Sequence, residues 1–361
     1  MKTSEFIAKL LQIIVLLLFA FGLVVIILMG LDVWLLQENK QLRQQVAQPA
    51  PAPTVPTMTA ANTAQAGTKD FFKKPDLSSL GNSPYDSLVR YGYALIHETY
   101  KYLGPDAPNP KMRYAGNRLA CQNCHLDAGT KYYGIPYVGV VGRFPQYRRR
   151  ENKVGSIEER INGCMERSMN GRSLPVDSRE MRAMVAYMQW ISRGVPTGEK
   201  IKGTGLPDIT LPDRPADTLR GKEIYELKCA SCHGKNGEGV RNQAGGYQYP
   251  PLWGPDSYND GAGMHRLITA AKFIKANMPF GATADAPMLS DEEAYDVAAF
   301  INAYHHPRPR KPGKEKDYPG SLERKPVSAP YGPYADTFPP IQHKYGPFPP
   351  IIEFYGGKNV K

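Results

Sequence analysis

Residues 121–125 read CQNCH, and residues 229–233 repeat the same frame as CASCH. In each copy two thiols lie three positions apart, and a histidine follows the second thiol directly. Thiols at this spacing reach the two vinyl groups of one haem, and the adjacent histidine reaches its iron. A single copy could be a chance match, or a redox or zinc-binding pair. Two copies, each preceded and followed by a helix in an exported chain, favour two covalently bound haem c groups instead. The predicted attachment cysteines and proximal histidines are Cys121, Cys124, His125, Cys229, Cys232 and His233.

Each motif follows a predicted helix. Apolar residues recur at helical spacing over residues 88–103, before the first motif. Before the second motif, Asp217 is placed to cap a helix whose apolar residues are Leu219, Ile224 and Leu227. The two halves of the chain therefore follow the same plan, which indicates a duplication.

A further apolar helix closes each copy, over residues 184–191 in the first and 297–304 in the second. Little strand is expected between these helices. The predicted fold is mainly α, with two tandem cytochrome c domains preceded by an N-terminal transmembrane helix and a stalk.

The transmembrane helix is predicted from the run between Ile13 and Leu31, which carries no charge. As a helix this run rises about 28 Å, close to the apolar thickness of a bilayer. Lys2 and Lys9 precede it, so the positive-inside rule leaves the N-terminus in the cytoplasm and exports the rest. Apolar character continues to Trp34, which favours an uncleaved inner-membrane anchor with the globular part in the periplasm.

The domain organisation follows from composition, since 33 Pro and 34 Gly among 361 residues indicate long irregular stretches. The region after residue 307 combines many prolines with aromatic residues that are too apolar for a free tail, so we expect it to lie along the surface of both domains. The predicted segments are a membrane anchor (1–36), a Pro/Ala-rich stalk (37–75), cytochrome c domain 1 (76–198), cytochrome c domain 2 (199–306) and a Pro/Tyr-rich extension (307–361).

The formal charge of +11 and the 22 tyrosines are compatible with nucleic-acid binding. However, no basic stripe with a known nucleic-acid motif is present. An anionic small substrate or an acidic protein partner fits the charge as well, and we expect no nucleic acid as a partner.

The second haem needs a sixth ligand, and Met278 is the favoured residue because Asn277-Met278-Pro279 is typical of a methionine ligand loop. A His/Met pair raises the reduction potential, which suits an electron exit. The alternatives downstream of the second motif are Met264, His265 and Met288.

The first haem has a different candidate, the fifth cysteine Cys164, which has no other cysteine left for a disulfide. Arg160 and Arg167 flank it, and nearby cations favour a thiolate, which binds iron and lowers the haem potential. A buried structural thiol is the simpler reading, but Cys164 follows its motif at a distance comparable to that of the methionine loop in the other half. His97 and Met169 are weaker candidates for the ligand.

With these motifs the chain, over roughly residues 85–355, resembles the dihaem thiosulfate dehydrogenases, also described as bifunctional thiosulfate dehydrogenase/tetrathionate reductases. The resemblance rests on CQNCHLDAGT (121–130), FPQYRRR (144–150), RINGCMERSMNG (160–171), CASCHG (229–234) and FIKANMP (273–279). It implies a His125/Cys164 pair on the first haem. It also implies His233 and Met278 on the second, because Asn277 stands where some members have a lysine ligand.

The resemblance further implies a substrate pocket beside Cys164, made by Arg150, Arg160 and Ser168. Coupling two thiosulfate dianions into tetrathionate brings like charges together, and clustered guanidinium groups offset that repulsion. In the family mechanism the cysteine also holds one thiosulfate sulfur covalently as a nucleophile.

The expected function is therefore a membrane-anchored periplasmic enzyme that couples thiosulfate to tetrathionate or catalyses the reverse reduction. Electrons would pass through the second haem to a small c-type cytochrome or a membrane respiratory component. The alternative is a dihaem electron carrier, or a subunit of a respiratory or sulfur-oxidising assembly, without its own substrate turnover. A thiolate ligand among cations favours the enzyme, because a carrier has no need for one.

Overall fold

The computed structural model describes residues 22, 29–31, 34, 37–38, 68–319 and 325–357. Most of the predicted anchor and stalk lies outside these residues. Within the described part of the chain, no helix combines the length and apolar composition that a bilayer crossing needs. The chain divides into two units, residues 1–64 and 65–361, and the second unit contains both haem motifs.

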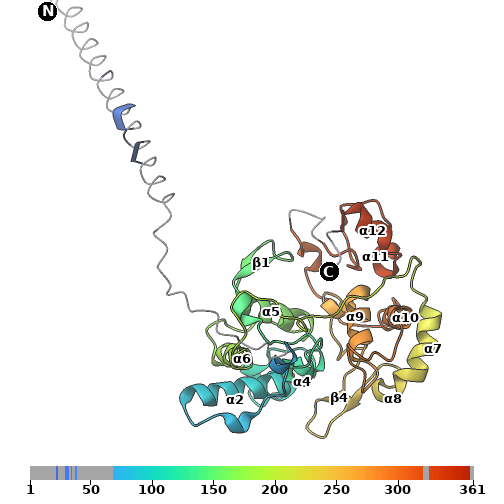
Figure 1. Ribbon diagram of the computed structural model, residues 1–361, viewed down its shortest axis with the longest axis horizontal. Coiled ribbons are helices and arrows are strands. Elements are labelled where there is room, and N and C mark those ends of the chain that lie inside the picture. Colours follow the sequence, from blue (N-terminus) through green and yellow to red (C-terminus); the bar gives the residue numbers. More distant parts are fainter. Residues whose placement is uncertain are drawn as a thin grey trace, which may run out of the picture. The chain divides into compact units, whose positions relative to one another are not determined.

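The second unit is mainly helical and consists of two halves (Figure 1). The first half contains α2 (Pro84–His97), α3 (Thr99–Tyr102), α4 (Leu126–Gly129), α5 (Ile157–Arg167) and α6 (Arg179–Trp190), and the antiparallel pair β1 (Gln146–Arg148) and β2 (Lys153–Gly155). The second half contains α7 (Thr218–Lys228), α8 (Ala230–His233), α9 (Leu267–Asn277) and α10 (Asp291–Ile301), and the antiparallel pair β3 (Val240–Arg241) and β4 (Tyr247–Tyr249). Helices α11 (Pro340–Tyr345) and α12 (Pro349–Phe354) belong to the C-terminal extension.

Short 3-10 helices connect these elements. They are η1 (Thr68–Phe71), η2 (Leu77–Ser79), η3 (Pro110–Met112), η4 (Cys121–Asn123), η5 (Val141–Arg143), η6 (Gly263–His265) and η7 (Lys314–Lys316). The mainly helical architecture in two similar halves, predicted from the duplicated motifs, is confirmed.

Each half is built on a pair of packed helices, α2 with α6 and α7 with α10. Glycine makes the close approach possible in both pairs. A Cβ on Gly92 of α2 would collide with the backbone of Ala183, and a Cβ on Gly221 of α7 would collide with the backbone of Asp296. The two halves therefore share a close helix contact at a glycine, as well as the same order of helices and motif.

Local signals set the helix boundaries. Helix α2 begins at a capping box formed by Ser83 and Asp86. The predicted helix over residues 88–103 breaks at Glu98, which separates α2 from α3. Asp217 caps α7 as predicted, accepting hydrogen bonds from the backbone N–H groups of Leu219 (2.8 Å) and Arg220 (3.1 Å).

The helix predicted through Leu219, Ile224 and Leu227 is confirmed as α7. Two of these residues face solvent, since the exposed fractions of Leu219 and Leu227 are 76% and 82%. The buried face consists of Gly221, Ile224 and Tyr225, because the glycine contact fixes which side of α7 meets α10.

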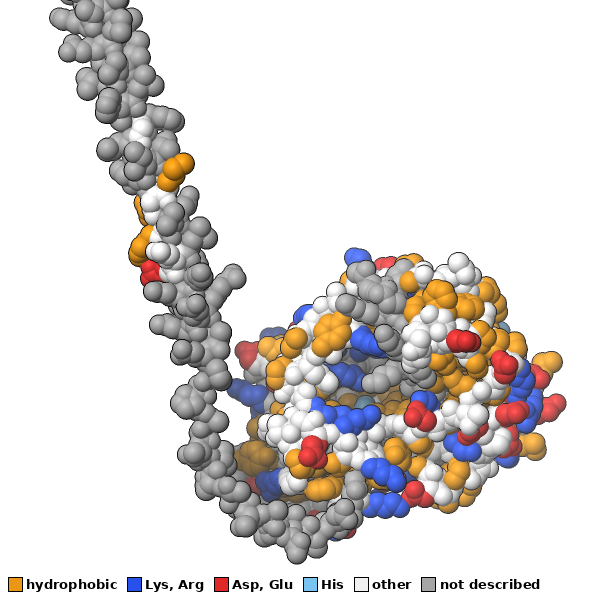
Figure 2. All heavy atoms as spheres, turned by 45° about the horizontal axis from the view of Figure 1, so that its top comes forward, with side chains coloured by type: hydrophobic (Ala, Val, Ile, Leu, Met, Phe, Trp, Pro, Cys, Tyr) orange, Lys and Arg blue, Asp and Glu red, His pale blue; other side chains and the backbone are white. Residues whose placement is uncertain are grey.

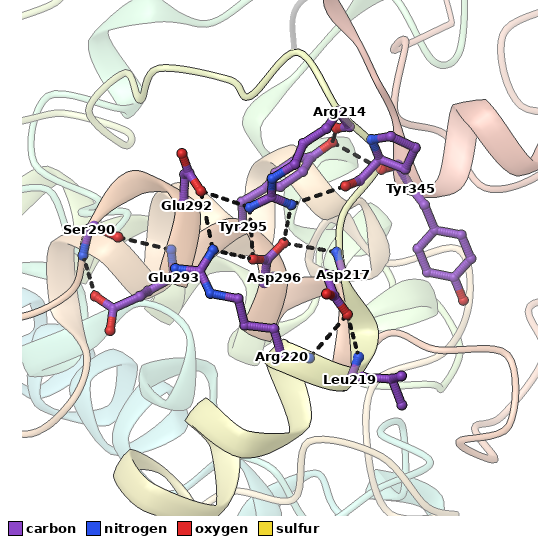
Figure 3. Close-up of polar contacts among 11 residues, drawn as sticks. Arg214, Asp217, Leu219, Arg220, Ser290, Glu292, Glu293, Tyr295, Asp296 and Tyr345 are labelled. Carbon is purple, nitrogen blue, oxygen red and sulfur yellow. Dashed lines mark hydrogen bonds and ion pairs between the residues drawn. The ribbon is translucent and has the colours of Figure 1, made fainter.

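A carboxylate inside the second half holds the connection between the two halves in place (Figure 3). The Asp296 side chain on α10 is fully buried and accepts two hydrogen bonds of 2.9 Å from Arg214, which precedes α7. It also accepts from Arg220 Nη1 at 3.1 Å and from the backbone N–H of Asp217 at 2.9 Å. Asp296 thereby joins α10, the start of α7 and the end of the interdomain segment.

We expect Asp296→Asn to lower the free energy of unfolding by about 3 kcal/mol, because it leaves two arginines facing a neutral amide in a buried position. This lies at the low end for a broken buried ion pair, since both arginines keep contact with solvent. Chemical denaturation of the haem-loaded protein, followed by circular dichroism, measures the change. Glu292→Gln is the matched control, because Glu292 contacts the same two arginines at the exposed surface; equal losses in both variants would contradict the prediction.

The C-terminal extension contacts both halves. Phe348 and Ile351 are fully buried against the apolar cluster of the second half. Asp317, earlier in the extension, accepts a hydrogen bond of 2.7 Å from Arg150 of the first half. The extension therefore places a carboxylate next to a predicted site residue.

Candidate functional site

The two CxxCH motifs fold into single helical turns that orient their histidines. In the first, η4 begins at Cys121, and Nδ1 of His125 lies 2.6 Å from the carbonyl oxygen of Ile135. In the second, Nδ1 of His233 lies 2.8 Å from the carbonyl oxygen of Pro250. Because a carbonyl oxygen only accepts, Nδ1 carries the proton in each ring, which leaves Nε2 free to bind a metal.

None of the four cysteines of the motifs forms a disulfide. Burial raises the pKa of Cys121 to about 11, that of Cys124 to about 12 and that of Cys229 to about 11. Two partly buried, unpaired cysteines next to an oriented histidine suit thioether attachment of a haem in each motif.

The donor sets also fit haem iron. No group of three His, Cys, Asp or Glu side chains able to hold a metal ion occurs among the residues that the structure describes. Each motif instead offers one histidine, and a sulfur-bearing residue follows it later in the chain, Cys164 or Met278. One nitrogen and one sulfur donor suit an iron whose other four positions are filled by the macrocycle.

Cys164 lies at the centre of the first half, on α5. Arg160 precedes it by one helical turn on the same face, and Arg160 Nη1 donates a hydrogen bond of 2.8 Å to Cys164 Sγ. Burial raises the pKa of Cys164, but Arg160, the His125 imidazole and Arg167 together outweigh it, so the pKa falls to about 5. The sulfur is therefore a thiolate at neutral pH.

The same sulfur lies close enough to His125 for this residue to help lower the pKa of Cys164. The structure thus brings together the two residues predicted to ligate the first haem. The weaker candidates have other surroundings: His97 stacks on Tyr93, with ring centroids 5.2 Å apart, and Met169 is buried in the apolar core of this half.

Arg160 and Arg167 stabilise the Cys164 thiolate, and Arg150 and Arg266 interact electrostatically with Arg160. Arg150, Arg160 and Arg167 come from the first half, and Arg266, at the start of α9, comes from the second. Burial, Arg150 and Arg160 lower the pKa of Arg167, to about 10. Burial also lowers the pKa of Arg266, with further lowering by Arg150 and Arg160. These mutual effects place the four guanidinium groups in one concentration of positive charge.

The predicted site residues differ in how closely they approach Cys164. Arg160 contacts the sulfur directly, whereas Arg150 Nη1 donates to the Gly261 carbonyl at 2.9 Å and to Asp317 at 2.7 Å. Ser168 is the C-cap of α5, and its backbone N–H donates to the Cys164 carbonyl. All of them lie on or next to the helix that carries the thiolate.

Basic side chains are prominent on the surface of this unit. Figure 2 shows acidic and basic groups together on one face, with several Lys and Arg side chains around a hollow near its centre. This distribution suits a small anion better than a long polyanion, which would need a continuous basic stripe.

Two residues of this region were missed by sequence reasoning. Tyr137 stacks on the His125 imidazole, with centroids 4.3 Å apart and planes 25° apart, and burial raises its pKa well above the ordinary value. Its only sequence signal is its position soon after the first motif, in a chain with 22 tyrosines. Arg266 lies in the other half, far from Cys164 in the sequence, so local spacing could not predict that it contributes to this region.

The second half has several sulfur and nitrogen candidates for the sixth ligand. Met278, the C-cap of α9, is half-buried against the apolar cluster of this half. Met288 is 53% exposed, which disfavours it as a buried ligand. Nδ1 of His265 lies 2.9 Å from the Asp260 carbonyl oxygen, so its Nε2 stays available, as in His125 and His233. The ligand loop Asn277-Met278-Pro279 keeps Met278 as the prediction.

Comparisons with known proteins agree with this arrangement. Residues 112–197 match the family described as the SoxA/TsdA cytochrome c domain, and residues 218–304 match the cytochrome c family. The thiosulfate dehydrogenase of Psychrobacter arcticus is 42% identical over 269 residues, which cover 74% of this chain and 78% of that protein. The thiosulfate dehydrogenase of Allochromatium vinosum is 47% identical over 213 residues, covering 58% of this chain and 76% of that protein.

Among solved structures, the thiosulfate dehydrogenase TsdBA from Marichromatium purpuratum matches with a TM-score of 0.62 and 36% identity. The match covers 73% of this chain and 54% of the solved chain, so this protein spans about half the length of that one.

Each cytochrome c match contains one of the two CxxCH motifs, and the chain therefore binds two haem c groups covalently. It is an oxidoreductase. The resemblance that the motifs indicate is confirmed, and the chain belongs to the dihaem thiosulfate dehydrogenase family.

Proposed function

We propose that this protein oxidatively couples two thiosulfate ions to tetrathionate at Cys164, and that it also catalyses the reverse reduction. The observation that carries the proposal is the Cys164 thiolate, 2.8 Å from the Arg160 guanidinium and near His125. A thiolate next to a haem ligand, and among arginines, is suited to a sulfur-containing dianion. The relatives at 42% and 47% identity, both named thiosulfate dehydrogenase, support the same reaction.

The charge of the site explains how two dianions can meet. Arg150, Arg160, Arg167 and Arg266 carry four positive charges in this region, against the two carboxylates of Asp317 and Glu151 that pair with Arg150 and Arg167. Guanidinium groups bind the oxygens of a sulfonate end in a fork, and in a buried site they stabilise charge strongly. The arginines therefore lower the cost of bringing a second thiosulfate to the first.

The chemistry balances in two steps at one sulfur. In the first, the Cys164 thiolate forms a bond to the outer sulfur of thiosulfate, and two electrons leave the site. In the second, another thiosulfate attacks that same sulfur atom, the bond to Cys164 breaks, and tetrathionate departs with the thiolate restored. A haem accepts one electron at a time, so two haems match the two electrons released.

The proposal also includes the path of the electrons and the cellular location of the enzyme. Electrons would leave through the second haem, with His233 and Met278 as its ligands, to a small c-type cytochrome or a membrane respiratory component. The uncharged run between Ile13 and Leu31 supports an inner-membrane anchor that holds the enzyme at the periplasmic face.

An anaerobic titration of the oxidised, detergent-solubilised protein with thiosulfate tests the function. We expect haem reduction, followed by absorbance, and tetrathionate formation at one molecule per two electrons. If thiosulfate leaves the haems oxidised, a reduced protein should be reoxidised by tetrathionate. If thiosulfate does not reduce the haems and tetrathionate does not reoxidise them, while ascorbate still reduces them, the proposal is contradicted and an electron carrier is favoured.

A further inference from the structure

The C-terminal end of α5, the helix that carries Cys164, is closed by a residue of the second half. The last carbonyl groups of a helix have no partner within it and must find one elsewhere. Here the Asn259 side chain donates to the Glu166 carbonyl at 2.8 Å, and the Asn259 backbone N–H donates to the Arg167 carbonyl at 3.2 Å. One asparagine thereby fixes the end of the thiolate helix.

A second residue reinforces this junction. Asn117 of the first half donates to the Ser168 carbonyl at 2.9 Å and to the Ser257 carbonyl at 3.1 Å, so it ties the C-cap of α5 to the segment that contains Asn259. Asn117 and Asn259 are both almost fully buried. Hydrogen bonds in such dry surroundings are costly to break, because the groups left behind find no water.

The same part of the second half also contacts the loop that orients His125. The segment around Asn259 leads through η6 into α9, which ends at Asn277. The Asn277 side chain crosses to the first half and donates to the Tyr133 carbonyl at 3.1 Å. Two residues further along that loop, the Ile135 carbonyl accepts from His125.

We propose that Asn259 and Asn277 are positioning residues, through which the second half sets the separation between Cys164 and His125. The inference rests on the proposed assignment of these two residues as ligands of the first haem. Asn259 holds the helix of one ligand, and Asn277 holds the loop of the other. A pair of metal ligands needs positions fixed to about 0.5 Å, and both of these supports come from the second half.

The arrangement also joins the two haem sites. Met278, the candidate ligand of the second haem, follows Asn277 directly in the sequence. The Asn277 contact with Tyr133 therefore connects the ligand loop of the second haem to the histidine loop of the first.

The test compares Asn259→Ala and Asn277→Ala with Asn302→Ala in the haem-loaded protein. The exposed fractions of Asn259, Asn277 and Asn302 are 1%, 2% and 3%. The Asn302 side chain donates to the Met264 carbonyl and accepts from the Tyr258 hydroxyl, so its bonds to other elements stay within the second half. It is thus a matched control for the loss of a buried amide.

The readout is electron paramagnetic resonance of the oxidised protein without thiosulfate, which reports thiolate ligation directly. We expect Asn259→Ala to lose part of the thiolate-ligated low-spin signal, and Asn277→Ala to shift or broaden it. Asn302→Ala should keep the wild-type signal despite a similar loss of stability. A parallel fall of about 10-fold in kcat/KM for thiosulfate is expected for Asn259→Ala, as for other small misplacements of a reacting group.

Unchanged thiolate signals in both interface variants, with stability losses equal to that of Asn302→Ala, would overturn the proposal. A wild-type protein with no thiolate signal would overturn it as well, by removing the ligand assignment. Because the readout uses no thiosulfate, a failure here is distinguishable from a failure of the proposed enzyme activity.

Discussion

Cys164→Ala should no longer be reduced by thiosulfate, with kcat/KM lower by about 10³-fold or more. The thiolate is the nucleophile in the proposed reaction, and alanine offers neither a sulfur for the covalent step nor a ligand for the iron. The low pKa of Cys164, about 5, means that the wild-type site holds the reactive form at neutral pH without a separate base. Stopped-flow absorbance of the haems after mixing with thiosulfate measures the loss.

The controls separate lost chemistry from lost structure. Both haems should remain attached in Cys164→Ala, because attachment depends on the CxxCH cysteines, and ascorbate or dithionite should still reduce them. Met169→Leu is the matched variant, since Met169 is a nearby sulfur side chain in the buried core. We expect it to keep most of the activity and the thiolate signal. Substantial thiosulfate oxidation by Cys164→Ala would remove Cys164 from the mechanism.

The sequence predicted those parts of the fold that depend on local spacing. The CxxCH frames, the Asp217 cap of α7 and the Arg160 and Cys164 pair on one face of α5 all lie within a few residues of one another. Helical geometry alone brings such residues together. Their arrangement could therefore be inferred before any tertiary contact was known.

Contacts across the domain junction could not be inferred in this way. Arg266 and Asn259 belong to the second half, yet one contributes charge near Cys164 and the other closes the helix that carries it. Nothing in their local sequence distinguishes them from solvent-facing polar residues. Apolar spacing likewise does not say which face of α7 is packed, because a glycine contact selects that face and leaves Leu219 and Leu227 exposed.

Arg160→Gln should have the second large effect, a fall of about 10² in kcat/KM for thiosulfate. Glutamine retains hydrogen-bonding capacity but removes the positive charge nearest to the Cys164 sulfur. Two consequences follow: the thiolate loses its main counter-charge, and the incoming dianion loses one of the groups that offset repulsion. Because both effects act on the approach of thiosulfate to the sulfur, steady-state kinetics with a cytochrome c acceptor should show the loss in kcat/KM.

Two further variants identify which property of Arg160 matters. Arg160→Lys keeps the charge but not the planar fork, so partial recovery would assign the larger share to charge, whereas a loss equal to that of the glutamine variant would assign it to bidentate geometry. Arg172→Gln makes the same charge change at an exposed position of the same half, where the guanidinium stacks on Tyr114. We expect that variant to leave kcat/KM nearly unchanged, because solvent and salt screen an exposed charge. Equal losses of kcat/KM in Arg160→Gln and Arg172→Gln would contradict the prediction. Net charge would then explain the effect, and the contact between Arg160 and Cys164 would not contribute to catalysis.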